Sequence, residues 1–125
     1  MYSKAAIDHF LKPRHAGALA GPGVASGQAT NADCGDIATF FVTAADGRLQ
    51  VAFQCQGCAG AVAACSVAAQ SLAGQPVATA QAPEAAELQA VLAPWPPAKL
   101  GCTAMAAAAL AQALSAWRAS QPGAQ

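Results

Sequence analysis

The alternation of apolar and polar residues in the middle of the chain predicts a β-hairpin. β-Branched and aromatic residues alternate along residues 37–43, Asp46-Gly47 is a favoured two-residue turn, and apolar residues alternate again along residues 49–53. Upstream, a glycine-rich passage leaves room for one more short strand, at residues 24–29. These segments predict a small β-sheet.

Near the N-terminus, the spacing of apolar residues predicts a short helix. Ser3 is a suitable N-cap, and Ile7, Phe10 and Leu11 fall on one face. Pro13 ends the helix, because its ring clashes with the preceding turn. We expect the face formed by the three apolar residues to pack against the rest of the protein.

Further helical segments follow the hairpin. One begins after Cys58 and ends where Gly74 can adopt the left-handed conformation. One or two shorter helices are expected within residues 76–93, then an extended segment at residues 95–99, and last a helix capped by Thr103. The residues expected to be buried on these later helices are Leu88, Val91 and Leu92, followed by Ala106, Leu110, Leu114 and Trp117.

Length and charge narrow the class of protein. With 125 residues the chain is expected to form one domain over 1–125, with 119–125 as a frayed tail. Six basic and six acidic residues give no net charge and no cluster of cations, which argues against nucleic acid as a partner. Because neither a secretory signal nor a long uninterrupted apolar stretch is evident, we expect a cytoplasmic protein without a membrane partner.

The five cysteines are the most informative residues of the sequence. In a reducing compartment they would remain thiols, which suggests metal or sulfur chemistry. Cys34, Cys58 and Cys102 each lie where an irregular or extended segment meets a regular element, and the last two precede predicted helices. A helix N-terminus lowers a thiol pKa from about 8.5, so we expect these sulfurs to be partly thiolate, the form that binds metals.

Small and acidic neighbours accompany these three thiols. Gly35, Gly57 and Gly101 are adjacent to them, and we expect these glycines to let the backbone approach a bulky ligand. Asp36 adds a hard oxygen ligand two residues after the first cysteine. Mixed oxygen and sulfur ligation would hold an iron–sulfur cluster less tightly than four thiolates would.

The remaining cysteines and the histidines are weaker candidates. Cys55 could add a ligand, form a redox disulfide with Cys58, or have no role. Cys65 lies two helical turns, or about 10 Å, beyond Cys58, too far to share one metal ion, and is expected to be a small buried hydrophobe. His9 and His15 are expected to be packed or solvated rather than to bind the metal.

Four segments of the chain resemble successive signatures of the IscU/NifU N-terminal scaffold family. They are AAIDHFLKPRHAG, ADCGD, FQCQGCAGAVAACS and PPAKLGCTAMAAAAL, in the order of the family and at similar spacing. The resemblance covers residues 2–118. It implies an α+β fold in which a small, mostly antiparallel three-stranded sheet packs against helices, with the cluster site at one exposed end.

The resemblance also implies a function and a set of site residues. Cys34, Cys58 and Cys102 would receive sulfur from a cysteine desulfurase and hold a labile [2Fe–2S] cluster, while Asp36 would tune its stability and release. The protein would then be a scaffold rather than an enzyme, passing clusters to acceptor proteins. Zinc can occupy the same ligands in the isolated protein.

Two positions depart from the family pattern. Gly101 stands where IscU proteins usually have a histidine, and Cys55 could replace that ligand. The SufU-type zinc proteins also lack the histidine but carry an insertion that is not evident here. WPPAK replaces the chaperone-binding motif LPPVK, so recognition by an Hsp70-type chaperone has weak support.

These departures leave two alternatives to the cluster scaffold. The first is a zinc-binding sulfur acceptor of the SufU type, with Cys102 as the sulfur-accepting nucleophile. The second is a family member that keeps the fold but binds no metal.

Overall fold

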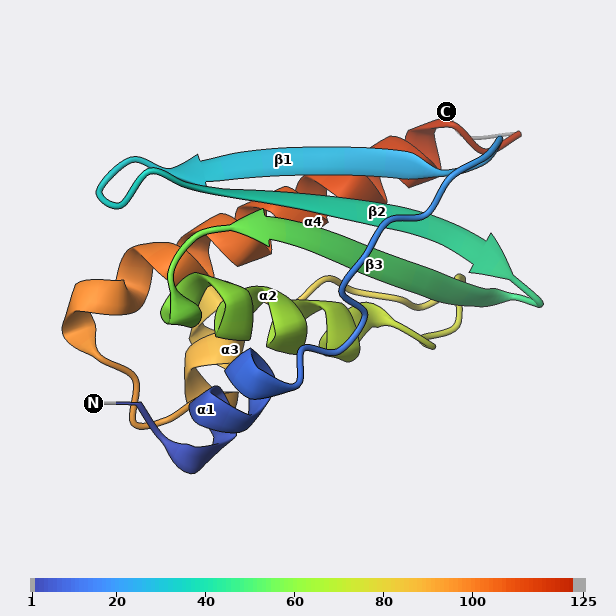
Figure 1. Ribbon diagram of the computed structural model, residues 1–125. Helices are drawn as coiled ribbons and strands as arrows, with labels where there is room; N and C mark the ends of the chain where they lie inside the picture. Colours follow the sequence, from blue (N-terminus) through green and yellow to red (C-terminus); the bar gives the residue numbers. More distant parts are fainter. Residues whose placement is uncertain (1, 123–125) are drawn as a thin grey trace.

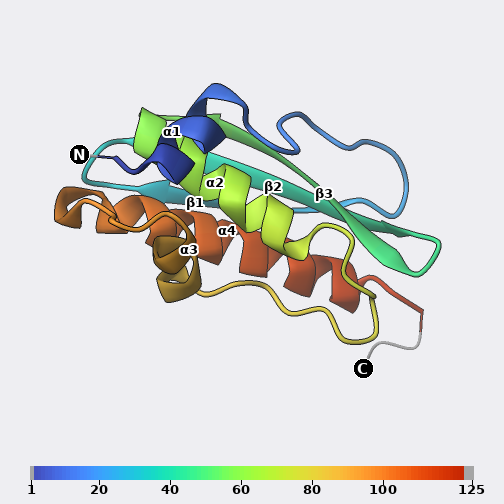
Figure 2. The same ribbon diagram turned by 90° about the horizontal axis from the view of Figure 1, so that it is seen from below.

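The protein is built from one antiparallel sheet with helices packed against one of its faces (Figure 1). The computed structural model describes residues 2–122. Strands β1 (Ala25–Asn31), β2 (Asp36–Ala45) and β3 (Arg48–Gln56) lie side by side in chain order. Figure 2 shows α2 (Ala59–Leu72) and α4 (Leu100–Ala119) running next to each other across the same face of the sheet. The predicted three-stranded α+β fold is confirmed.

The predicted hairpin forms around its Asp-Gly turn. Asp46 and Gly47 have φ angles of 54° and 75°, the left-handed pair that matches the twist of two antiparallel strands. The turn sets the register in which Ala45 pairs with Arg48, and this register brings Phe40 opposite Phe53 on the helix-covered face. Their ring centroids lie 5.9 Å apart, so the pair anchors the core beneath the helices.

The helix predicted after Cys58 is confirmed, whereas the predicted start of the last helix is wrong. Cys58 is the N-cap of α2, and Gly74 follows the helix with a φ of 84°. However, α4 begins three residues before Thr103, directly after the short 3₁₀ helix η1 (Pro97–Lys99). The Thr103 hydroxyl donates to the carbonyl of Leu100 and so lies inside the first turn. The residues predicted to be buried on α4 are buried, namely Ala106, Leu110, Leu114 and Trp117.

On α1 the residues predicted to be buried are exposed, whereas on α3 the prediction is wrong for one residue of three. Ser3 caps α1 (Lys4–Leu11) as expected, accepting the amide of Ala6 at 3.1 Å. However, Ile7, Phe10 and Leu11 are 47%, 41% and 68% exposed. On α3 (Ala85–Val91), Leu88 is buried and the adjoining Leu92 is buried, but Val91 is exposed.

The rotation of α1 is set by its small and polar residues. Ala6 and His9 face α2 and are buried, and the His9 Nδ1 atom lies 2.7 Å from the Ser66 hydroxyl of that helix. The Ser66 oxygen also accepts the backbone N–H of Arg14, so the hydroxyl links His9 to the chain that follows α1. His9 is thus packed, as expected, and holds α1 in an orientation that leaves the larger apolar residues outside.

The buried His9 is expected to make stability depend on pH. Burial, and then the nearby Arg14 cation, lower the pKa of His9 below its usual value. As the pH falls below about 6.5, the unfolded chain takes up a proton that the folded protein resists, so the free energy of unfolding falls. In His9→Asn, whose side-chain amide can replace Nδ1 as the hydrogen-bond partner of Ser66, this loss should be smaller by up to about 1.4 kcal/mol per pH unit.

Urea unfolding of both proteins between pH 7 and 5 measures this difference in slope. His15→Asn removes the exposed histidine and is the matched control. Equal slopes for His9→Asn and the wild type would contradict the assigned role of His9.

The helical run Pro97–Ala119 is long and apolar enough to cross a membrane. Half of its most apolar window is buried within the protein, because α4 packs along β1 and β2. Core helices of globular domains have the same composition, so this run is explained by its place in the core.

The tail predicted to fray comprises residues 119–125. Ala119 is the last residue of α4, and residues 120–122 form a turn. Residues 123–125 lie outside the described part of the chain.

Candidate metal centre

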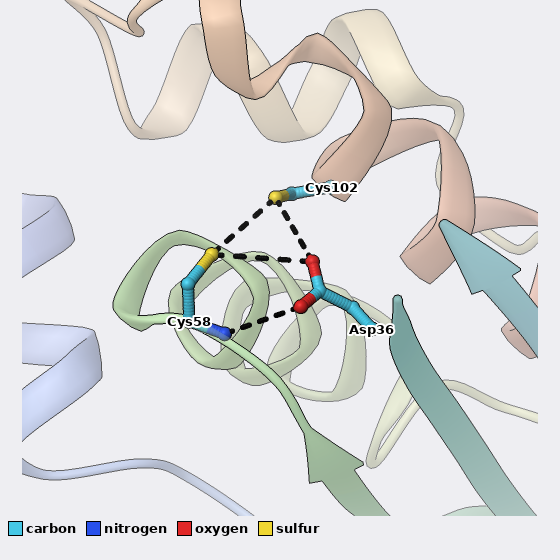
Figure 3. Close-up of side chains that lie close together, drawn as sticks. All are labelled: Asp36, Cys58 and Cys102. Atoms are coloured by element: carbon cyan, nitrogen blue, oxygen red, sulfur yellow. Dashed lines mark hydrogen bonds between the residues drawn. The ribbon is translucent and has the colours of Figure 1, made fainter. Parts of the chain in front are cut away.

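Three of the predicted ligands come together at the end of the molecule where β2, α2 and α4 begin (Figures 1 and 3). Asp36 is the first residue of β2, Cys58 is the N-cap of α2, and Cys102 is the third residue of α4. Their donor atoms all lie within 4.8 Å of one another. Residues far apart in sequence therefore meet because three elements start at one end of the sheet.

The three donor atoms form a nearly equilateral triangle. The Cys58 and Cys102 sulfurs are 3.9 Å apart, and Oδ2 of Asp36 lies 4.0 Å from the first and 3.9 Å from the second (Figure 3). Two sulfurs bound to one tetrahedral ion at about 2.3 Å would be about 3.8 Å apart. The triangle thus fits three corners around a tetrahedral ion such as zinc or the iron of a cluster.

A backbone amide holds the Asp36 carboxylate in this triangle. The amide of Cys58 donates to Oδ1 at 3.3 Å, which leaves Oδ2 facing the two sulfurs. A Cβ atom on Gly57 would lie 2.7 Å from Oδ1 and 2.9 Å from the Cβ of Ala61. This glycine therefore gives room to a side chain of the site itself, not only to a ligand as the sequence suggested.

Asn31 is a member of the site that sequence reasoning missed. Its side chain is 8% exposed, and Nδ2 lies 3.5 Å from Oδ2 of Asp36 and 3.9 Å from the Cys102 sulfur. Strand alternation places Asn31 on the helix-covered face of β1 together with Gly27. A polar residue at a core-facing strand position was the signal that could have identified it.

Lys99 brings a positive charge to the edge of the site. Its Nζ donates to the Cys58 sulfur at 3.5 Å, and this contact raises the pKa of Lys99. The Trp95 indole N–H donates to the Lys99 carbonyl at 2.8 Å, and the Tyr2 ring packs against Trp95 at a centroid distance of 5.6 Å. The sequence alone indicates Lys99 only as part of the segment that replaces the chaperone-binding motif.

The expectation that Cys102 is partly thiolate is wrong for the metal-free protein. Burial raises the pKa of Cys102 to about 12, and the nearby Cys58 and Asp36 add to the increase. Cys102 does lie in the first turn of a helix, but it is fully buried. Desolvation and neighbouring acidic groups therefore outweigh the helix N-terminus and the Lys99 charge.

Cys34 lies outside the triangle. It is exposed, in the loop between β1 and β2, where its amide and that of Gly35 donate to the Asn31 carbonyl at 3.2 Å and 2.8 Å. Gly35 has a φ of 70°, which allows the loop to turn directly into Asp36.

Cys55 also lies outside the group of three donors. It is half-buried on β3, and its interaction with the Cys65 thiol of α2 lowers the pKa of Cys55. Cys65 is fully buried, and the same interaction together with burial raises its pKa. Cys65 is thus the buried residue that its helical position predicted.

The fold and the donor set define a small α+β protein with a candidate sulfur-rich metal centre. A model of the family described as NifU-like N terminal domain matches residues 1–123. The chain therefore belongs to the NifU-like N-terminal domain family, which confirms the resemblance.

Named relatives and solved structures agree with this assignment. The chain is 34% identical to iron-sulfur cluster assembly scaffold protein IscU 1 of Archaeoglobus fulgidus, over 91% of this chain and 74% of the relative. It is 29% identical to iron-sulfur cluster assembly scaffold protein IscU of Rickettsia prowazekii, over 94% of this chain and 92% of the relative. The NifU-like N-terminal protein from Brucella abortus has the same fold, with a TM-score of 0.71 and 20% identity over 95% of each chain.

The fold likeness extends to a SUF-type protein. A putative iron-sulfur cluster assembly scaffold protein for the SUF system from Fervidobacterium islandicum has a TM-score of 0.60 and 19% identity, over 90% of this chain and 96% of that one.

Proposed function

We propose that this protein is a scaffold on which a labile [2Fe–2S] cluster is assembled and then passed to acceptor proteins. The observation that carries the proposal is the triangle of Asp36, Cys58 and Cys102 at the end of the sheet, in a chain of the NifU-like N-terminal family. The protein would hold and deliver the cluster rather than catalyse a reaction on it.

Each side chain has a distinct part in this proposal. The Cys58 and Cys102 sulfurs would bind iron, and the Asp36 carboxylate would supply a harder and weaker ligand for a cluster that must leave again. Lys99 lies 3.5 Å from the Cys58 sulfur and would offset part of the negative charge gathered there. Because Cys102 is buried and its pKa is raised to about 12, metal binding would release its proton.

Cys34 has the accessibility that sulfur delivery requires. A persulfide on a cysteine desulfurase transfers sulfur when an acceptor thiolate attacks the outer sulfur, so that a new S–S bond forms and the donor thiolate leaves. Cys34 is exposed beside Asp36, whereas Cys102 is fully buried. We therefore propose Cys34 as the first acceptor, in place of Cys102, and as a cluster ligand once its loop moves towards the triangle.

Anaerobic reconstitution tests the scaffold function. Purified protein is incubated with ferrous iron, cysteine, a cysteine desulfurase and dithiothreitol, which reduces the delivered sulfane sulfur to sulfide, and then with an apo-ferredoxin acceptor. We expect visible sulfur-to-iron charge-transfer absorption that moves to the ferredoxin, and we expect neither signal from Cys58→Ala. A wild-type protein that forms no cluster under these conditions would contradict the proposal.

A second function is favoured by the tetrahedral spacing of the donors and by the position of Cys34 outside them. In a zinc-binding sulfur acceptor, zinc would bind Asp36, Cys58 and Cys102, while Cys34 accepts sulfur without cluster formation. One zinc per chain, sulfur transfer lost in Cys34→Ala, and no cluster on reconstitution would together support this alternative over the scaffold.

A further inference from the structure

We propose that Asn31 is a positioning residue of the metal centre, and that residue 101 is glycine because the Asn31 amide fills the space beside it. The inference rests on the proposed function, since it concerns the same site. Asn31 binds no metal in this proposal but orients the groups that do.

Asn31 lies at the junction between β1 and the loop that carries Cys34. It is the last residue of β1 and pairs across the sheet with Asp36, the first residue of β2. Its carbonyl accepts the amides of Cys34 and Gly35, so its backbone closes the loop that carries the exposed cysteine. Its side chain turns the other way, towards the helix-covered face.

The side chain of Asn31 contacts two of the three donors. Nδ2 lies 3.5 Å from Oδ2 of Asp36 and 3.9 Å from the Cys102 sulfur. An ionised carboxylate only accepts hydrogen bonds, so the amide nitrogen is the end of Asn31 that suits this contact. The two oxygens of Asp36 are thus held by different donors, Oδ1 by the Cys58 amide and Oδ2 by Asn31.

The bare Cα of Gly101 makes this arrangement possible. A Cβ atom at residue 101 would lie 2.7 Å from Oδ1, 3.0 Å from Nδ2 and 3.1 Å from Cγ of Asn31. Such contacts are too short, so any side chain at residue 101 must displace the amide. Because Gly101 directly precedes Cys102, the same contact fixes the start of α4 against β1.

A displaced amide should weaken metal binding without removing a ligand. Partners that orient metal ligands typically contribute about 10- to 100-fold to affinity. Asn31→Ala removes the donor directly, and Gly101→Ala pushes it away. If both changes act through one contact, their effects on affinity should not multiply.

A double-mutant cycle with Co²⁺ as the probe tests this contact. Co²⁺ affinity is measured by competition with a chromophoric chelator, and the thiolate-to-cobalt absorption reports sulfur ligation. We expect Asn31→Ala and Gly101→Ala each to lower the affinity by about 10- to 100-fold. The double variant should be no weaker than the weaker single variant. Thr30→Ala, at the preceding exposed position of β1, is the matched control and should bind as the wild type does.

Urea unfolding of the metal-free variants provides a second readout. Gly101→Ala should be destabilised by the crowding, and adding Asn31→Ala should restore part of the stability. Unchanged Co²⁺ affinity in Asn31→Ala, or losses that multiply in the double variant, would overturn the role of Asn31 while leaving the proposed function intact. A wild-type protein that binds no Co²⁺ would overturn both.

Discussion

Replacing Cys58 or Cys102 by serine is expected to lower the affinity for Zn²⁺ by at least about a hundredfold. The free energy of zinc binding to structural sites is about 10–16 kcal/mol for four ligands. One ligand therefore contributes about 3 kcal/mol, or about a hundredfold in affinity. Each of these sulfurs forms one corner of the donor triangle, 3.9 Å from the other. Serine keeps the shape of cysteine but offers a poor ligand for a soft metal.

Zinc competition with a chromophoric chelator measures this loss. Cys65→Ala is the matched control, because Cys65 is a buried thiol on the same helix that lies outside the donor group. Its affinity for zinc should equal that of the wild type. If the Cys58→Ser and Cys102→Ser variants bound zinc as tightly as the control, the triangle would not be the metal site.

Gly27→Ala is expected to destabilise the fold by about 3 kcal/mol, the upper part of the range for overpacked cores. The new Cβ would lie 2.4 Å from the amide nitrogen of Ala113 and 2.5 Å from the carbonyl oxygen of Ala109. Both are backbone atoms of α4, so the clash cannot be relieved by turning a side chain. β1 would have to separate from the helix that carries Cys102.

The urea concentration at the midpoint of unfolding measures this loss of stability, provided that the slope of the free energy of unfolding against urea concentration is unchanged. Ser26→Ala is the matched control, since Ser26 is the neighbouring exposed residue of β1. A Gly27→Ala protein with the midpoint of the wild type would mean that β1 and α4 do not pack as closely as described.

The parts of the fold that local sequence dictates were predicted well. The Asp46-Gly47 turn with alternating strands, Ser3 as a cap and Gly74 after α2 are each decided by a few adjacent residues. The rotation of α1 was not predictable in this way. Its outcome depends on His9 meeting Ser66, a residue 57 positions away, so the larger apolar residues did not decide which face was buried.

The candidate site likewise has features that the sequence predicts and features that depend on tertiary packing. Cysteine position and the family resemblance identified Asp36, Cys58 and Cys102, which the structure brings together. The raised pKa of Cys102 was missed because burial depends on the packing of α4, which one sequence does not reveal. Asn31 was missed because its contacts with Asp36 and Cys102 depend on how the end of β1 meets α4, although its core-facing position on the strand was a signal.

X-ray absorption at the zinc edge tests the central claim most directly. For protein loaded with one equivalent of zinc, we predict at least two sulfurs at about 2.3 Å and at least one oxygen at about 2.0 Å, as Cys58, Cys102 and Asp36 would supply. In the Cys58→Ser/Cys102→Ser variant the sulfur shell should be lost. A wild-type shell made only of oxygen and nitrogen, or a sulfur shell that survives both substitutions, would contradict a metal centre at this site.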